Sequence, residues 1–270
     1  AWSAAAQEAI SLIINNVEAQ YSPGRGGYDV QAVIGVIDAQ GMPIADLKAS
    51  EFTVRQDGSD VEGFELEPAT GGIRLLLTID TSGSMAAEGK MAAVKEACET
   101  FVQGLGGQDQ VGLISFNEQS KVEINITGDR TAVQNFVELL QPRQGAGTCL
   151  WDAAYEAVQV ASAMEHGRRG VILLTDGVDE LLGGGTCSRK TLEDVIGLAT
   201  DPTIRVPVYT VGVGRRVNEQ DLARVADLTG GRSFLAASAA SVGDLFSDLG
   251  LQLRSGYTLR YWSATASGEH

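Results

Sequence analysis

The sequence has few of the residues on which many enzymes and membrane proteins depend. Only 2 of its 270 residues are histidine and 3 are cysteine. No apolar stretch reaches the length of a membrane span, so we expect no direct membrane insertion of this segment. Lysine and arginine total 20 against 35 aspartate and glutamate, a net charge of −15. Nucleic acids and anionic membrane surfaces bind basic patches, and this composition disfavours both as partners.

The remaining composition is that of a folded protein, with 44% apolar and 20% charged residues. From Ile73 to Leu253, apolar runs alternate with amphipathic helical patterns. We predict strands at 73–79, 111–116, 171–175, 206–211 and 231–236, an antiparallel edge strand at 120–126, and helices at 90–105, 132–140, 150–164, 192–199, 219–228 and 242–253. This alternation predicts a doubly wound α/β domain over residues 71–253, with a mostly parallel sheet and helices on both faces.

The flanks have a different pattern. Residues 1–70 carry 11 acidic residues against 3 basic ones, which marks a shift in composition near residue 70. Strands are predicted at 28–38 and 256–262, and Asp57-Gly58 predicts a hairpin. The simplest interpretation is a small β-sandwich of residues 1–70 and 254–270, with the α/β domain inserted in it. Residues 1–20 fit either a helix or a strand.

The most informative segment is the strand predicted at 73–79, because a set of oxygen donors follows it. Asp80 comes directly after the apolar run, and Ser82 and Ser84 follow at two-residue spacing. Ligands of open α/β sheets bind at the carboxyl ends of strands. Thr148 lies in a glycine-rich loop just before a helix, and Asp176 ends the strand at 171–175. Carboxylates and hydroxyls are hard ligands of the kind Mg²⁺ takes, so the sequence predicts a metal site there.

The order of these residues resembles the metal-ion-dependent adhesion site of the von Willebrand factor type A domain family, which includes the integrin inserted domains. The family pattern Asp-x-Ser-x-Ser, then Thr, then Asp matches Asp80, Ser82, Ser84, Thr148 and Asp176. The resemblance covers about residues 72–253. It implies a bound Mg²⁺, with Mn²⁺ or Ca²⁺ as substitutes, that accepts an Asp or Glu carboxylate from a protein partner.

The flanks look like the sandwich elements that surround this domain in bacterial surface or secreted proteins. The resemblance therefore implies a cation-dependent adhesion or protein-binding module outside the cytoplasm, either secreted or at the cell surface. Any anchor would lie in segments beyond these residues. The alternative is an intracellular type A domain that serves as a subunit of an ATPase-driven chelatase or chaperone complex.

Simpler and rival interpretations remain for single residues. Alone, Asp80 could be a helix cap, and Ser82 could be a turn residue. Phosphoryl transfer on Asp80 is a rival chemistry, but such enzymes usually need a second acid two residues on, where Ser82 stands. The two histidines are His166 and His270, and no Gly-x-Ser-x-Gly elbow occurs, so we do not expect an enzyme.

The three cysteines leave two arrangements open. Cys98 lies on the apolar face of its predicted helix and is expected to be a buried free thiol. Cys149 follows Thr148, and Cys187 lies in the loop after Asp176, so both are expected at the rim of the same face. We predict a Cys149–Cys187 disulfide, with two unpaired thiols as the alternative. The disulfide would imply an oxidising compartment.

Overall fold

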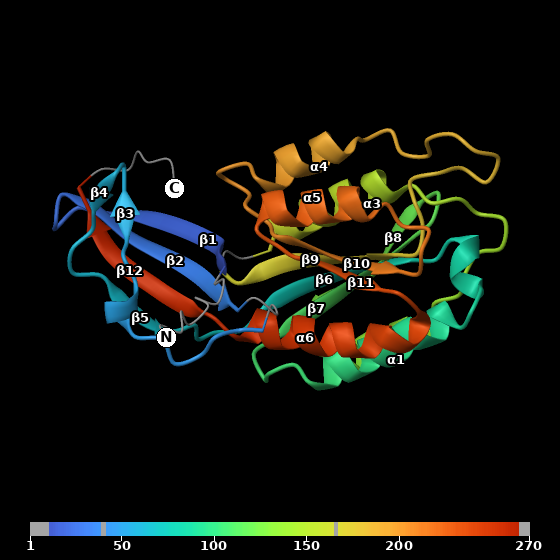
Figure 1. Cartoon of the computed structure of the whole chain (residues 1–270), viewed down its shortest axis with the longest axis horizontal. Helices are drawn as coiled ribbons and strands as arrows, with labels where there is room; N and C mark the ends of the chain where they lie inside the picture. Colours follow the sequence, from blue (N-terminus) through green and yellow to red (C-terminus); the bar gives the residue numbers. More distant parts are fainter. Residues whose placement is uncertain (1–10, 39–41, 165–166, 265–270) are drawn as a thin grey trace, which may run out of the picture. The chain divides into compact units, whose positions relative to one another are not determined.

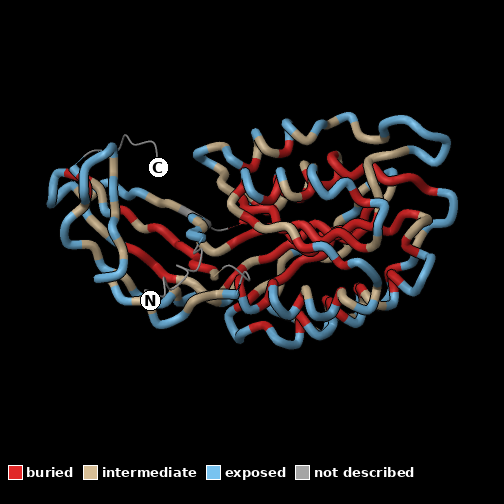
Figure 2. Tube along the Cα trace, viewed as in Figure 1, coloured by how far each residue is buried: buried red, intermediate tan, exposed pale blue. Residues whose placement is uncertain are grey.

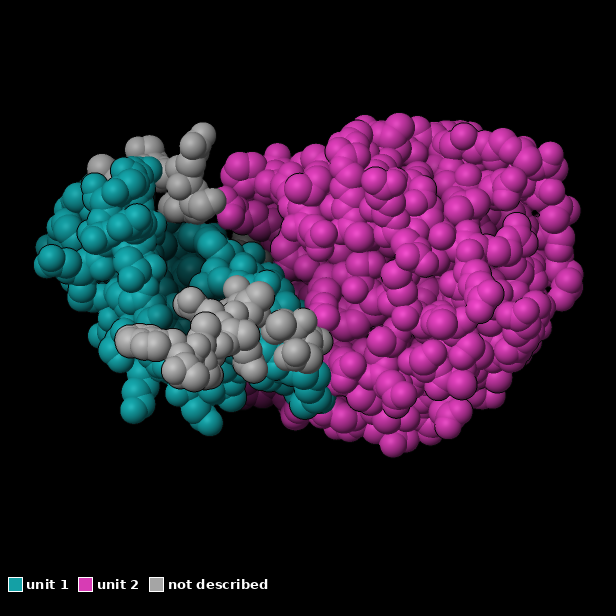
Figure 3. All heavy atoms as spheres, viewed as in Figure 1, with its two compact units in different colours: residues 1–70, 251–270 teal, residues 71–250 magenta. Residues whose placement is uncertain are grey.

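The computed structural model describes residues 11–38, 42–164 and 167–264. The chain divides into two compact units, one of residues 1–70 with 251–270 and one of residues 71–250 (Figure 3). Within the described ranges, no helix has both the length and the apolar character needed to cross a membrane.

The larger unit is built on a six-stranded sheet in the order β11-β10-β9-β6-β7-β8 (Figure 1). Its strands are β6 (Arg74–Asp80), β7 (Gln110–Phe116), β8 (Ser120–Thr127), β9 (Arg169–Thr175), β10 (Val208–Val213) and β11 (Ser233–Ala236). β8 pairs antiparallel with β7 at one edge, and all other pairs are parallel. The predicted sheet and its antiparallel edge strand are confirmed, and each strand lies within two residues of its predicted limits.

Helices cover both faces of this sheet, as predicted. They are α1 (Lys90–Gln103), α2 (Arg130–Leu139), α3 (Leu150–Ser162), α4 (Leu192–Ala199), α5 (Glu219–Thr229) and α6 (Val242–Arg254). Figure 1 shows α3, α4 and α5 on one face and α1 and α6 on the other. β9 is buried along its whole length because helices cover both of its faces, which explains its continuous apolar run (Figure 2). Between α1 and α6, the rings of Phe101 and Phe246 meet edge to face, with their centroids 5.7 Å apart.

The smaller unit contains a four-stranded antiparallel sheet in the order β1-β2-β12-β5. Its strands are β1 (Ser11–Ser22), β2 (Gly27–Ile37), β5 (Glu65–Pro68) and β12 (Tyr257–Ser263). By sequence, residues 1–20 fit both a helix and a strand, and the described part of that segment is a strand. β12 lies between β2 and β5, so the C-terminal strand completes a sheet that the N-terminal residues begin.

The second layer of this unit is mostly irregular. It comprises the segment 43–64, whose regular strands are the two-residue β3 (Arg55–Gln56) and β4 (Ser59–Asp60). Asp57 and Gly58 join them with φ values of 52° and 76°, the left-handed turn that the Asp-Gly pair predicts. The hydroxyl of Tyr257 ties this layer to the sheet, because it accepts from Leu47 N (2.9 Å) and donates to Ile44 O (3.0 Å).

Candidate metal centre

The predicted site lies at β6, where the chain changes the direction in which it adds strands to the sheet. β6 is followed by β7 on one side, and the chain later returns to β9 on the other side. β6 and β9 pair in parallel through Ile79 opposite Leu174, so Asp80 and Thr175 end neighbouring strands at one edge. In open α/β sheets this reversal leaves a crevice beyond the carboxyl ends of the strands, which is where ligands bind.

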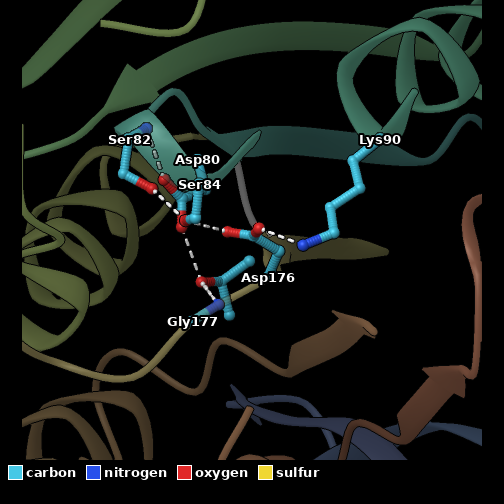
Figure 4. A network of polar contacts seen from close by, with 7 residues as sticks. Asp80, Ser82, Ser84, Lys90, Asp176 and Gly177 are labelled. Atoms are coloured by element: carbon cyan, nitrogen blue, oxygen red, sulfur yellow. Dashed lines mark hydrogen bonds and ion pairs between the residues drawn. The ribbon is translucent and has the colours of Figure 1, made fainter. Parts of the chain in front are cut away.

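Four of the five predicted residues are joined by hydrogen bonds at this edge (Figure 4). The backbone N–H of Ser82 donates to Asp80 Oδ1 (2.7 Å), and the Oγ atoms of Ser82 and Ser84 lie 3.1 Å apart. Ser84 Oγ donates to Asp176 Oδ1 (2.7 Å). Ser84 belongs to a single 3₁₀ turn, Gly83–Ala86, which turns its side chain back toward the strand ends. The hydroxyls of Ser82 and Ser84 and the carboxylate of Asp176 therefore form a chain of oxygen contacts, and the Ser82 N–H joins Asp80 to it.

Thr148, the fifth residue, is brought to the same edge by the loop before α3. Its N–H donates to Glu180 O (2.8 Å), and its carbonyl accepts from Glu180 N (3.0 Å). A Cβ built on Gly177 would lie 3.8 Å from Thr148 Oγ1, so the hydroxyl lies beside the residue that follows Asp176. Gly147 allows the close approach of the two loops, since a Cβ there would meet Glu180 O at 2.5 Å.

A disulfide between Cys149 and Cys187 closes this loop pair, as predicted. Cys98 is a buried free thiol, also as predicted. Asp179 adds a second connection: its carboxylate accepts from Leu150 N at the start of α3 (2.9 Å) and from Ser188 N (3.1 Å). Thr148 is thus fixed on both sides, by a backbone bridge and by a covalent bond one residue away.

Two further residues belong to the site and are not among the five predicted ligands. Thr175 Oγ1 donates to Asp80 Oδ2 (2.6 Å) and accepts from Gly177 N (3.2 Å). Lys90 Nζ donates to Asp176 Oδ2 (2.8 Å). The Thr-Asp-Gly run at the end of β9 could have drawn attention to Thr175. Lys90 is the first residue of a helix 86 positions away from its partner, and its role follows only from the fold. His166 and His270 lie outside the described residues.

Burial sets the electrostatics of the centre. It raises the pKa of Asp80 from its ordinary 3.8 to about 6, against the hydrogen bonds from Thr175 and Ser82, which lower it. The charge of Asp176 raises it further. An ionised carboxylate at this depth is costly unless a cation or donors compensate it. A cation bound beside Asp80 would offset that cost.

The donor set fits a hard divalent cation. It offers two carboxylates and three hydroxyls, without sulfur or imidazole, and Mg²⁺ prefers oxygen ligands. Adjacent ligands of an octahedral Mg²⁺ lie about 3 Å apart, given Mg–O distances of about 2.1 Å. The Ser82 and Ser84 hydroxyl oxygens, 3.1 Å apart, already have that spacing. In the part of the chain that the structure describes, no group of three or more His, Cys, Asp or Glu residues could hold a metal ion, and the proposed site itself has two carboxylates and three hydroxyls.

Comparison with known proteins identifies the family of the larger unit. The profile of the von Willebrand factor type A domain matches residues 75–248. A curated relative, a UPF0353 protein of Mycolicibacterium paratuberculosis, is 26% identical over 200 residues. The alignment covers 66% of this chain and 60% of that protein. The chain thus spans about 60% of the length of this curated relative.

Solved structures that share the fold include the following three. A von Willebrand factor type A protein of Catenulispora acidiphila has a TM-score of 0.59 at 18% identity, over 92% of this chain and 50% of that one. Proximal thread matrix protein 1 of the mussel byssus, with a zinc-occupied MIDAS motif, has a TM-score of 0.61 at 17% identity, over 72% and 49%. The PilB minor pilin of Streptococcus sanguinis has a TM-score of 0.57 at 13% identity, over 93% and 80%.

Proposed function

Because the chain belongs to the von Willebrand factor type A domain family, we propose that its site binds Mg²⁺ and, through it, an acidic side chain of a protein partner. The chain is then a cation-dependent protein-binding or adhesion module. The observation that carries this proposal is the chain of polar contacts from Asp80 through Ser82 and Ser84 to Asp176 at the end of the sheet.

The residues that would hold the ion are Asp80, Ser82, Ser84, Thr148 and Asp176. Mn²⁺ and Ca²⁺ are expected to substitute for Mg²⁺, since both also accept oxygen ligands. When bound, the ion supplies an electrophile with coordination positions left for water or for an incoming carboxylate. The hydroxyls carry no charge, and two carboxylates only just neutralise a divalent cation, so the ion stays an electrophile with a coordination position that an outside carboxylate can fill.

We propose binding and not catalysis at this site. The hydroxyl of Ser84 donates to Asp176, and Asp80 is held by donors from Ser82 and Thr175. These hydrogen bonds hold oxygen atoms in place for coordination. Residue 82, where an aspartyl-phosphate enzyme would have its second acid, is a serine whose hydroxyl contacts another hydroxyl.

A protein is the partner that best suits the rim. Leu181 and Leu182 are both exposed, the latter 72%, and they lie on the loop that the disulfide closes. Gly147, next to Thr148, lies against the backbone of these two leucines. Exposed apolar side chains beside a polar site are typical of protein interfaces. We propose that a partner places its acid on the metal and apolar residues on Leu181 and Leu182.

The proposed location is outside the cytoplasm. Stable disulfides form in oxidising compartments, and the Cys149–Cys187 bond lies at the rim of the site. The same bond weighs against the intracellular alternative, a subunit of an ATPase-driven machine. The pilin PilB has the same fold, which agrees with a surface or secreted location.

Metal titration tests the proposal. Purified protein should bind one Mn²⁺ per chain, observed by the loss of the free Mn²⁺ signal in electron paramagnetic resonance, and Mg²⁺ should displace it. Asp80→Ala should bind none, because it removes charge from the centre of the site. Unchanged titration in Asp80→Ala would refute the assignment of the site.

The partner is tested by a separate experiment. A protein from the native source should be captured in the presence of Mg²⁺ and released by a chelator.

A further inference from the structure

The position of Lys90 is unfavourable for a positive charge in two respects. It is the first residue of α1, where the positive end of the helix dipole repels a cation. It is also only 7% exposed, and a buried ammonium is costly without a partner. Gly214, directly after β10, lies beside the side chain: a Cβ built there would lie 3.6 Å from Lys90 Cε. The side chain is therefore held in place against these costs.

Asp176 is the partner that offsets them. Lys90 Nζ lies 2.8 Å from Asp176 Oδ2, and this is a buried ion pair with side chains 9% and 0% exposed. The other oxygen of Asp176 accepts from Ser84 Oγ (2.7 Å). Asp176 thus lies between a proposed metal ligand, Ser84, and a fixed positive charge (Figure 4).

This ion pair changes the charge of the centre. Asp80 and Asp176 together carry two negative charges, enough to balance a divalent cation. Lys90 adds one positive charge in direct contact with Asp176, so the loaded centre has a net charge of about +1. One carboxylate from outside would bring the centre to neutrality.

We propose that Lys90 is a specificity-determining residue that weakens metal binding by the site alone and makes tight binding depend on an incoming carboxylate. This inference rests on the proposed function and adds to it the reason why an acidic ligand is needed. The bound metal then raises the affinity for the carboxylate, and the bound carboxylate raises the affinity for the metal. By thermodynamic linkage the two affinities rise by the same factor.

The first experiment uses the unaltered protein. Mn²⁺ is titrated with and without acetate, a carboxylate that stands in for the partner's acidic side chain. We expect saturating acetate to tighten Mn²⁺ binding at least fivefold, beyond the weak effect of acetate on free Mn²⁺. Chloride at the same ionic strength is the control. No tightening by acetate would overturn the inference without touching Mn²⁺ binding itself.

The second experiment removes the charge. Lys90→Met keeps the length of the side chain, and Lys90→Gln also keeps a donor toward Asp176. Both should bind Mn²⁺ at least tenfold tighter than the unaltered protein and lose most of the acetate effect. Lys90→Arg should keep both properties. Lys95→Met is the matched control, because Lys95 lies on the same helix but pairs with Glu138.

The outcomes separate the inference from the function on which it rests. Equal Mn²⁺ affinity in the unaltered protein, Lys90→Met and Lys90→Gln would overturn the role of Lys90 while leaving the metal site intact. If neither the unaltered protein nor either Lys90 variant binds Mn²⁺, with or without acetate, the proposed function fails and the inference fails with it. Far-ultraviolet circular dichroism confirms that each variant is folded. If Lys90→Met does not fold, Lys90→Gln and the acetate titration of the unaltered protein still decide.

Discussion

The hydroxyl of Thr175 donates to Asp80 Oδ2 across 2.6 Å and so joins the carboxyl ends of β9 and β6. Both side chains are fully buried. The same oxygen of Thr175 accepts from Gly177 N, which orients its hydrogen toward Asp80. The orientation of the Asp80 carboxylate thus depends on a residue that is not itself a proposed metal ligand.

Replacing Thr175 should therefore weaken both fold and site. Thr175→Val keeps the shape but leaves a buried carboxylate oxygen without its donor, which costs about 1–3 kcal/mol of unfolding free energy. Urea unfolding of the metal-free protein measures this loss, and Mn²⁺ titration should give weaker binding. Thr175→Ser keeps the hydroxyl and should stay close to the unaltered protein. Equal behaviour of the valine and serine variants would contradict the prediction.

Breaking the Cys149–Cys187 disulfide should destabilise the larger unit. The bond closes a loop over a sequence separation of 38 residues, for which the chain-entropy model gives about 3–4 kcal/mol. The double variant Cys149→Ser, Cys187→Ser should lose stability in urea and bind Mn²⁺ more weakly, because Thr148 is adjacent to Cys149. Dithiothreitol should lower the stability of the unaltered protein and leave the double variant unchanged. A similar response of both proteins to reductant would argue against the disulfide.

Cys98 should resist alkylation in the folded protein. It has no exposed surface, and burial raises the pKa of its thiol to about 12. At pH 8 the thiolate is then about 10⁻⁴ of the population, and iodoacetamide cannot reach it. Mass spectrometry should find no adduct on the native, non-reduced protein and one adduct after unfolding in guanidinium chloride.

The sign of the pH dependence of stability follows from the same shift. The neutral thiol is favoured in the fold, so its contribution is complete below pH 9 and is lost as pH rises through about 12. For the alkylation experiment, rapid reaction of the native protein at pH 8 would contradict the prediction, because it would show that the helix face carrying Cys98 is accessible.

Exposed Leu182 should affect the partner but not the metal. Leu182→Ser removes an apolar side chain that is 72% exposed, so stability and Mn²⁺ affinity should stay within error. The amount of partner captured in Mg²⁺ should fall several-fold. Leu228→Ser, on α5, removes a leucine that is 52% exposed and is the matched control. Equal capture by both variants would place the interface elsewhere.

Much of the α/β unit can be predicted from the sequence because its signals are local. An apolar run such as that of β9 must be buried on both faces, and parallel strands carry their terminal residues to one edge. Asp80 and Asp176 each follow such a run, so their placement at a common edge is expected from the sequence alone. The Asp57-Gly58 hairpin is another local signal, because two successive left-handed residues need those residue types.

The remainder depends on contacts between distant segments. The pairing of Lys90 with Asp176 follows from where α1 begins relative to β9, and no local pattern encodes it. The carboxylate of Asp179 accepts hydrogen bonds from the start of α3 and from the loop at Ser188, and this connection also depends on the tertiary fold. β1 is ambiguous by sequence for a different reason: its apolar residues fit both helical and strand spacing, and they are Leu12, Ile13, Ile14 and Val17.

The position of β12 between β2 and β5 has a consequence for biosynthesis. Gln31 on β2 hydrogen-bonds Arg260 on β12, a partner 229 residues later in the chain. At translation rates of about 5–20 residues per second, β2 emerges roughly 10–45 s before that partner exists. During this interval the β1–β2 hairpin has an unpaired edge with apolar side chains such as Ile34, which can recruit a strand from another nascent chain. Ribosome profiling of chaperone-bound nascent chains would detect this interval as occupancy that ends once β12 has left the ribosome.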